Sequence, residues 1–470
     1  MAGILPNITN IVVVMLENRS LDNLCGWLYS PPASAPTLFL PPGSQQSYNG
    51  LSSSLWNPQN KSYFHGAPPD PVPVVQGAAD TTVPDPDPEE TFDNVTAQIF
   101  GPPGSNPTPP PMLGFLVNYQ DRNPPDADQI MQTYIPSQVP VLTALARNYA
   151  VSDTWFCSVP SQTWPNRAFV HAGTSNGNVN NGDPPDPYDW DVPTIFNVLE
   201  SLGKSWAVYN DTIFTPSQVR TMFPKLWDPF LGSHFQGFEA FQDACYRDSL
   251  PQYSFLEPSF LVDPNDEHPP HDVTLGEQFL QAIWTAVSGS SAFDRILLVI
   301  LYDEHGGCYD HVPPAPNAVT PDAASNPGQE GFTFNRFGVR IPAVVVSPYV
   351  QAGTVFRSNT SVPYDHTSVL ATLRDWLSIP ESSMLPSKRI AAAPTLQQVL
   401  TLSKPRTSVP AIAAPSATVS ATPLTLPLND LQMSLVSGTA RRYGMDPVAV
   451  LSEVRTRQQA IDFFKRRPSR

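Results

Sequence analysis

The sequence predicts an α/β fold with a mostly parallel central sheet flanked by helices. Three short apolar runs, residues 11–16, 296–302 and 341–346, are rich in Val, Ile and Leu and do not alternate with polar residues. Uninterrupted runs of this kind are typical of parallel strands that are buried on both faces. Helical stretches lie between the runs, and strands that alternate with helices indicate a parallel sheet covered by helices.

Local signals predict further elements. Residues 205–211, SWAVYND, are expected to form a fourth strand. A helix is expected over residues 194–203, because Pro193 precedes this stretch and a glycine ends it. Residues 367–377, TSVLATLRDWL, have apolar positions at helical spacing and predict another helix.

One helix is predicted together with its N-terminal cap. In residues 274–289, TLGEQFLQAIWTAVSG, Thr274 and Glu277 have the spacing of a capping box. In that motif, the hydroxyl and the carboxylate each accept a hydrogen bond from the first turn of the same helix. We therefore expect this helix to begin at Thr274.

Two stretches depart from the alternation of strands and helices. Residues 30–125 are crowded with Pro, Gly, Asn, Asp and Ser, and are expected to form a long insertion in a domain that spans residues 1–402. Residues 403–427 are rich in Pro, Ala and Ser and predict a linker or extended arm. Residues 428–470 form an amphipathic tail with much basic charge. It is expected to be a helical element that packs on the domain or contacts a partner or membrane.

The composition argues against one class of partner. The 470 residues include 26 Lys and Arg against 42 Asp and Glu, a formal charge of −16. Non-specific nucleic-acid binding needs a cationic surface, so no nucleic-acid partner is expected. Anionic membrane surfaces should also repel the chain. The apolar fraction of 41 % is large enough to form a sizeable core.

The N-terminus and the cysteines bear on the cellular compartment. The first residues lack the basic and apolar regions of a signal peptide, and no run approaches the ~20 apolar residues of a membrane-spanning helix. The four cysteines fit no zinc pattern and are compatible with buried thiols or with disulfides. We therefore expect a soluble protein that is cytoplasmic or exported by a non-classical route.

Polar side chains follow two of the predicted strands where each ends. Glu17 and Asn18 come after residues 11–16, and Asp303 and Glu304 come after residues 296–302. The carboxyl ends of parallel strands meet at one edge of a sheet, where ligands bind. Buried carboxylates repel one another, and a hard divalent cation with oxygen ligands relieves that repulsion. The simpler interpretation, solvated strand ends, is weakened because two acidic ends occur and one is followed by Gly-Gly.

Thr163 is a candidate nucleophile on a stiff turn between Pro160 and Pro165. A helix is expected to follow from about Asn166. A hydroxyl that touches a metal at a helix N-terminus is activated as a nucleophile, and the free N–H groups there favour a phosphate. On the residues alone, a plain turn residue is the competing interpretation.

Two histidines precede the predicted capped helix. His268 and His271 lie in the segment NDEHPPHDV, directly before Asp272. Imidazoles at such a position donate hydrogen bonds to phosphate oxygens or protonate a leaving group. The absence of a Cys/His signature argues against a structural zinc site.

Five segments together resemble one known family. They are VVVMLENRSLDNLCGWL, SVPSQTWPNRAFVHAGTS, NDEHPPHDV, YDEHGGCYDHVPP and FGVRIPAVVVSPYV, in family order across residues 10 to about 375. They resemble the phosphoesterases that include the non-specific phospholipases C and a group of acid phosphatases. The resemblance implies an alkaline-phosphatase-like α/β fold. The tail beyond about residue 400 lies outside these segments.

The resemblance implies roles for particular residues. The expected ligands of one divalent metal ion are Glu17, Asn18, Thr163, Asp303 and Glu304. Ca²⁺ is favoured as the ion, with Mg²⁺, Mn²⁺ and Zn²⁺ as alternatives. Thr163 holds the position of the nucleophile and would form a phospho-threonine, and His271 is expected to contact the phosphate or the leaving group. Three neighbours are expected near the phosphate: Asn166, His171 and His305. His366 belongs to another family-like segment, and no role is assigned to it.

One segment departs from the family pattern. Relatives often carry DPGH before a segment like residues 98–101, whereas this chain has DPDPEE, with Glu90 near the place of the histidine. Glu90 is therefore kept as a candidate ligand or acid, or as a contact to phosphate.

These observations together favour a metal-assisted phosphoric ester hydrolase. Phospholipase C cleavage of glycerophospholipids, which releases diacylglycerol and a phosphorylated headgroup, is the favoured reaction, with transient contact to a membrane surface. Three alternatives are an acid phosphatase acting on phosphomonoesters, an exported lipolytic effector or toxin, and a non-enzymatic ion-binding module. The complete set of candidate ligands and Thr163 argues against the last, because a degenerate copy should have lost one of them.

Overall fold

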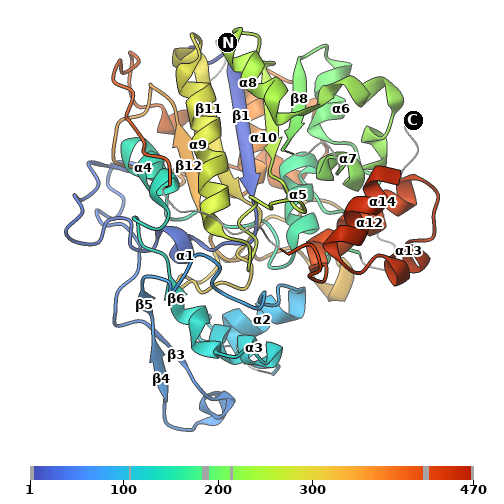
Figure 1. Ribbon diagram of the computed structural model, residues 1–470. Helices are drawn as coiled ribbons and strands as arrows, with labels where there is room; N and C mark the ends of the chain where they lie inside the picture. Colours follow the sequence, from blue (N-terminus) through green and yellow to red (C-terminus); the bar gives the residue numbers. More distant parts are fainter. Residues whose placement is uncertain (1–4, 105–106, 183–189, 212–214, 416–422, 467–470) are drawn as a thin grey trace.

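A nine-stranded sheet forms the centre of the protein (Figure 1). The structure is a computed structural model and describes residues 5–104, 107–182, 190–211, 215–415 and 423–466. The strands lie side by side in this order: β2 (Leu38–Leu40), β13 (Thr354–Phe356), β7 (Ala150–Ser152), β12 (Ala343–Val346), β11 (Ile296–Tyr302), β1 (Asn10–Leu16), β10 (Tyr253–Glu257), β8 (Trp206–Asn210) and β9 (Phe235–Gly237). The predicted α/β class with a large, mostly parallel sheet is confirmed.

The two strands that carry the candidate ligands are neighbours. β1 and β11 pair in parallel from Asn10 opposite Ile296 to Leu16 opposite Tyr302. Nearly every residue of both strands is buried, as the unbroken apolar runs predicted. Because the register is even, both strands end at the same level, and the backbone N–H of Asp303 donates to the carbonyl of Leu16 at 3.1 Å. Residues 17 and 303 therefore emerge together at one edge of the sheet.

The direction predicted for one strand is wrong. β12 is an apolar strand as expected, but it pairs antiparallel to both β11 and β7. A parallel partner needs a crossover that brings the chain back to the starting edge. The segment between β11 and β12 contains, among its described elements, only the 3-10 turn Gln329–Gly331, so the chain enters β12 from the edge where β11 ended. A strand buried on both faces has the same apolar sequence whether it runs parallel or antiparallel to its neighbours, so the sequence could not give the direction of β12.

Helices cover both faces of the sheet. In Figure 1, α8 (Phe238–Tyr246) and α9 (Val273–Gly289) cross the near face, and α10 (Thr367–Trp376) lies behind it. The remaining helices outside the tail are α1 (Leu21–Cys25), α2 (Phe92–Phe100), α3 (Phe115–Tyr119), α4 (Pro140–Asn148), α5 (Thr163–Ala172), α6 (Ile195–Ser201), α7 (Gln218–Met222) and α11 (Lys388–Ala392).

No helix in the described ranges is long and apolar enough to cross a membrane. All four cysteines are buried and free.

The capping box predicted for α9 is wrong. The helix begins at Val273, and its cap is Asp272, whose carboxylate accepts from the N–H of Thr274 at 2.8 Å. The Glu277 carboxylate instead accepts from the N–H groups of Val141 and Leu142 in the first turn of α4. Glu277 thus caps a different helix, a tertiary contact that the local spacing imitates.

This contact gives a stability prediction. Replacing Glu277 by leucine keeps a similar volume but removes both acceptors, leaving two buried N–H groups unpaired. We expect the free energy of unfolding to fall by about 1–3 kcal/mol, as measured by urea denaturation. The control is Gln278→Leu, because Gln278 is exposed on the same helix. Equal stability of both variants would show that the carboxylate does not stabilise α4.

The Pro-rich insertion is more structured than its composition indicated. It adds β2 to one end of the main sheet, and it forms a small sheet from β3 (Trp56–Pro58) and β4 (Pro71–Pro73). A second small sheet pairs β5 (Val75–Gln76) with β6 (Gln132–Thr133). Helices α2 and α3 pack on a separate apolar cluster that includes Ile99 and Phe115. In Figure 1 the two small sheets, α2 and α3 lie below the end of β1.

The C-terminal tail is helical and packs on the domain. It comprises α12 (Asp430–Arg442), α13 (Pro447–Glu453) and α14 (Arg457–Arg466). Its apolar residues form a cluster with Leu261 of the domain. Gln432 donates to the carbonyl of Phe260 at 2.7 Å, so the tail contacts the loop that follows β10. Part of the predicted linker, residues 416–422, and the last four residues lie outside the described ranges.

Candidate active site

The ends of β1 and β11 form a buried acidic cluster. Glu17, Asn18, Asp303 and Glu304 are all fully buried. Asp303 Oδ1 accepts from the backbone N–H groups of Asn18 at 2.9 Å and of Glu304 at 2.8 Å. Asn18 has a φ of 52°, a left-handed conformation that asparagine adopts more readily than most residues. The structure therefore brings together the four residues that the strand ends predicted.

A glycine makes this close approach of the two strand ends feasible. Gly306 has a φ of 61°, and a Cβ on it would lie 2.2 Å from the carbonyl oxygen of Asn18. Its backbone N–H donates to Glu304 Oε2 at 2.7 Å. Only glycine fits this position, and its N–H orients one of the acidic side chains.

Thr163 lies at the first position of α5, next to the cluster. Its hydroxyl Oγ1 is 3.2 Å from Glu17 Oε2 and 3.4 Å from Asn18 Oδ1. Only 1 % of Thr163 is exposed. The hydroxyl thus contacts both residues of the first strand end from the first position of a helix, whose next two residues offer no free N–H, because Trp164 donates to Asn181 Oδ1 at 2.8 Å and Pro165 has no N–H.

Asn166 shapes the loop that holds Thr163. Its amide donates to the carbonyls of Val159, Ser161 and Gln162, and its oxygen accepts from the N–H of Val159. All of these contacts are to the preceding loop. The side chain therefore positions the turn, and the contact to phosphate that the resemblance implied for Asn166 has no free amide group to support it.

Arg167 was not among the predicted site residues. It follows Thr163 by four residues, so both side chains lie on the same side of α5. Its guanidinium forms a buried ion pair with Glu17 Oε1 and donates to the carbonyl of Met15 at 3.1 Å. The i, i+4 spacing from the candidate nucleophile was the signal that could have identified it.

The residues of the cluster fit a divalent cation. Asp303 Oδ2 and Glu304 Oε1 are buried and have no hydrogen-bond partner in the described part of the chain. Burial raises the pKa of Glu17 well above its usual range; the Arg167 charge opposes this, and the Asp303 charge adds to it. Buried carboxylate oxygens that lack partners are costly unless they are protonated or bind a cation. Carboxylate, amide and hydroxyl oxygens together are a ligand set for a hard ion.

Glu90 and His268 border the same cluster. The amide of Asn18 lies 3.3 Å from Glu90 Oε1 and 3.1 Å from His268 Nε2. With Asp87, these two side chains form a group that could hold a metal ion. The insertion thus delivers an acid, Glu90, beside a predicted ligand. His268, which the sequence offered with His271 as a contact to phosphate or a proton donor, contacts that ligand, Asn18, directly.

A second acidic group is already neutralised. Asp22, Asp310 and His311 could also hold a metal ion by their spacing. Arg340 forms ion pairs with Asp22 at 2.9 Å and with Asp310 at 3.0 Å, and it is fully buried. The guanidinium occupies the place of a cation, so this group is a structural ion-pair network.

His271 is held between a carboxylate and a guanidinium. Its Nδ1 lies 2.6 Å from Asp266 Oδ1, and its Nε2 lies 2.5 Å from Arg457 Nη2. Arginine is a donor only, so Nε2 accepts and Nδ1–H donates to the carboxylate. The carbonyl of Asp266 accepts from the N–H of Glu17 at 2.9 Å, which links His271 to the cluster. Arg457 lies in the tail and was not predicted.

The other predicted histidines have different surroundings. His305 Nε2 contacts Gln98 Oε1 at 2.8 Å, and its Nδ1 lies 3.2 Å from Glu304 Oε2 without a hydrogen bond among the described residues. His171 lies against Phe255, with ring centroids 4.5 Å apart, and burial lowers its pKa well below the usual range. It belongs to the apolar core behind the site. His366 Nε2 donates to the carbonyl of Asp303 at 2.6 Å, which supports the end of β11.

The chain is similar in sequence to known proteins. The model of the Phosphoesterase family matches residues 8–380. Non-specific phospholipase C3 of Arabidopsis thaliana is 34 % identical over 417 residues, covering 86 % of this chain and 75 % of that protein. Phospholipase C B of Mycobacterium tuberculosis is 27 % identical over 414 residues, covering 80 % of this chain and 75 % of that protein.

Among solved structures, the similarity is weaker. A protein in the alkaline phosphatase superfamily from Vibrio parahaemolyticus aligns with 55 % of this chain and 67 % of its own, at 13 % identity and a TM-score of 0.29. The α/β class is established by the nine-stranded, mostly parallel sheet described above.

Proposed function

The chain belongs to the phosphoesterase family and is a phosphoric ester hydrolase, and we propose that it is a phospholipase C acting on glycerophospholipids. The single observation that carries the mechanism is the position of Thr163 Oγ1, within 3.4 Å of both Glu17 and Asn18 at the start of a helix. The relatives named as phospholipases C align over most of the chain, which supports the choice of a phosphodiester substrate.

We propose one divalent metal ion at the acidic cluster, with Ca²⁺ favoured over Mg²⁺, Mn²⁺ and Zn²⁺. The ligands would be the predicted set: Glu17, Asn18, Thr163, Asp303 and Glu304. When bound, the ion supplies Lewis acidity to phosphate oxygens and lowers the pKa of the hydroxyl. The partnerless oxygens of Asp303 and Glu304 support this assignment.

The proposed reaction has two displacements at phosphorus. In the first, Thr163 Oγ1 bonds to phosphorus as its proton passes to Glu17 Oε2, 3.2 Å away, and the bond from phosphorus to the glycerol oxygen breaks. That oxygen takes the proton from Glu17, so diacylglycerol leaves and the phosphorylated headgroup remains on Thr163. In the second, water bonds to phosphorus and gives a proton to Glu17, the threonine bond breaks, and Thr163 takes the proton back from Glu17. His271 donates through Nδ1 to Asp266 and accepts at Nε2 from Arg457, so it orients these two groups and transfers no proton.

A substrate panel tests this function. Purified enzyme with Ca²⁺ is incubated separately with phosphatidylcholine, phosphatidylethanolamine and p-nitrophenyl phosphate, and the products are identified. We expect diacylglycerol and the phosphorylated headgroup from at least one phospholipid. Phosphatidic acid as the product would contradict the proposed bond cleavage, and activity on p-nitrophenyl phosphate alone would favour the acid phosphatase.

A further inference from the structure

Arg457 is a buried cation delivered to the site by the C-terminal tail. It is the first residue of α14, lies outside the part of the chain that matches the family model, and is only 4 % exposed. Its Nη2 contacts His271 Nε2 at 2.5 Å. The tail helices lie beside α5 and α7 in Figure 1, which is the side of the domain where Thr163 begins α5.

The guanidinium has donors to spare. Nε and Nη1 of Arg457 are buried and have no hydrogen-bond partner among the described residues. A buried guanidinium with unpaired N–H groups is costly. Arg340 shows how the same chain stabilises a buried arginine elsewhere, with two carboxylates at 2.9 and 3.0 Å. Arg457 instead contacts a neutral imidazole, and Asp266, the nearby acid, uses Oδ1 for His271.

The position of Arg457 relative to the cluster is defined by a short chain of contacts. Arg457 bonds to His271, His271 bonds to Asp266, and the carbonyl of Asp266 accepts from the N–H of Glu17. The rings of His271 and His268 have centroids 5.8 Å apart, and His268 contacts Asn18. These contacts place the guanidinium beside His271, whose neighbours Asp266 and His268 each contact a residue of the cluster.

We propose that Arg457 is a substrate-binding residue, whose free Nε and Nη1 donate to oxygens of the substrate phosphate and so complete the active site from the tail. This inference rests on the proposed function, because it assigns the anion to a phosphate ester at the same site. The planar fork of N–H groups matches two phosphate oxygens, as it matches a carboxylate. The Asp266 charge acts on this guanidinium only through space, opposing the effect of burial on the pKa of Arg457, and a phosphate would give Nε and Nη1 direct acceptors.

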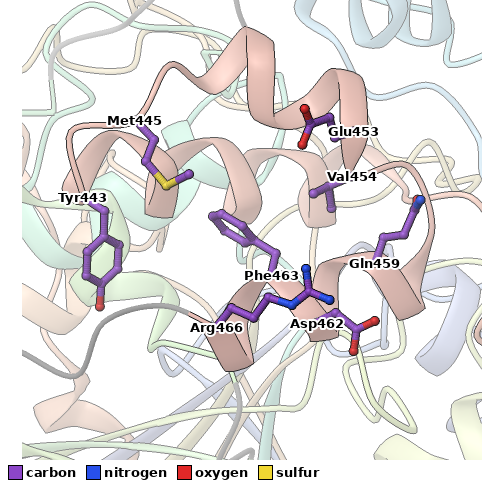
Figure 2. A pocket seen from close by; sticks show the side chains of 8 residues that line it. All are labelled: Tyr443, Met445, Glu453, Val454, Gln459, Asp462, Phe463 and Arg466. Carbon is purple, nitrogen blue, oxygen red and sulfur yellow. The ribbon is translucent and has the colours of Figure 1, made fainter.

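The C-terminal tail also contains a surface cavity, which is separate from the contact between Arg457 and His271. A cavity of about 630 Å³ lies between the tail helices and is lined by residues that include Tyr443, Met445 and Phe463. Figure 2 shows Phe463 among these side chains, and Arg457 is not one of the lining residues. The spare donors of Arg457 thus belong to the buried site and not to this surface cavity.

Binding of inorganic phosphate tests the inference. Calorimetry compares the metal-loaded wild type with Arg457→Gln and Arg457→Lys. Glutamine keeps a donor for His271 but removes the charge and the fork, and lysine keeps the charge alone. We expect the dissociation constant to rise about 10–100-fold in Arg457→Gln and less in Arg457→Lys, with bound metal and Tm unchanged. The control Arg455→Gln removes the same charge from an exposed position two residues earlier and should bind phosphate as the wild type does.

Each outcome decides the inference. Unchanged phosphate affinity in Arg457→Gln, or no phosphate binding by the wild type, would overturn it. Faster hydrolysis in Arg457→Gln would also overturn it, because the tail would then block the site instead of completing it. If the wild type hydrolyses none of the panel substrates but binds phosphate through Arg457, the proposed function fails and the binding residue stands.

Discussion

Thr163→Ala is expected to reduce kcat by at least about 10⁴-fold, because the variant lacks the oxygen that bonds to phosphorus. The loss should appear in kcat more than in KM, since the remaining residues still bind the substrate. Bound metal should fall only modestly, because four of the five proposed ligands remain. Steady-state kinetics on the phospholipid selected by the panel provides the measurement.

Two variants control for the removal of a hydroxyl from this loop. Thr163→Ser keeps a hydroxyl at the same position and should retain measurable turnover. Ser161→Ala removes a buried hydroxyl two residues earlier, whose Oγ contacts Asn180 at 3.3 Å, and should keep nearly full activity. Substantial activity in Thr163→Ala would refute Thr163 as the nucleophile.

Asp303→Asn is expected to abolish metal binding and to lower activity by at least about 100-fold, the effect that even residues behind the ligands have on metal sites. The asparagine oxygen replaces Oδ1 as the acceptor from Asn18 and Glu304, so the strand end keeps its hydrogen bonds. The amide NH₂ then takes the place of the free Oδ2, and it cannot coordinate a cation. Metal content of the purified proteins, measured by mass spectrometry after Ca²⁺ loading, checks the result.

The matched control for Asp303→Asn is Glu257→Gln. Glu257 is a fully buried acid at the end of β10, the strand next to β1. Its oxygens accept from the N–H groups of Gln218 and Val219 at the start of α7, so it is not free to bind an ion. This variant should keep its metal. Equal metal content in Asp303→Asn and the wild type would remove the proposed ion from this cluster.

The sheet edge that forms the site was predictable because strand burial and strand ends are local signals. The runs before Glu17 and Asp303 indicated strands buried on both faces, and parallel neighbours must end at one edge. What the pattern could not give was the direction of β12, since an antiparallel strand with two covered faces has the same apolar run. The capping box predicted for Glu277 is wrong for a related reason: its spacing fits a cap of its own helix, but its carboxylate caps α4.

The geometry of α5, the helix that carries Thr163, decides which of its residues can reach the acidic cluster. Arg167, one turn further on, reaches the cluster, whereas His171 follows Thr163 by eight residues and so lies about 12 Å along the axis. Helical geometry alone therefore places His171 away from the phosphate. Asn166 is close enough, but its hydrogen bonds to the loop are tertiary details that no spacing reveals.

Contacts between segments that are far apart in the chain could not be predicted from the sequence. Arg457 lies 186 residues from His271, and no local pattern indicates that the two meet. The basic charge of the tail was visible in the sequence, but a helical tail on the surface and one that inserts an arginine beside the site have the same amphipathic pattern. The role of Glu90 likewise depends on how the insertion folds back to Asn18.

The stereochemical course at phosphorus tests the central claim most directly. A phosphatidylcholine analogue with a chiral phosphorothioate is hydrolysed by the wild type in ¹⁸O-water, and the configuration of the released thiophosphocholine is determined. Each in-line displacement inverts phosphorus, so attack by Thr163 followed by attack by water predicts overall retention. Inversion would show a single direct attack by water and would contradict the covalent role of Thr163.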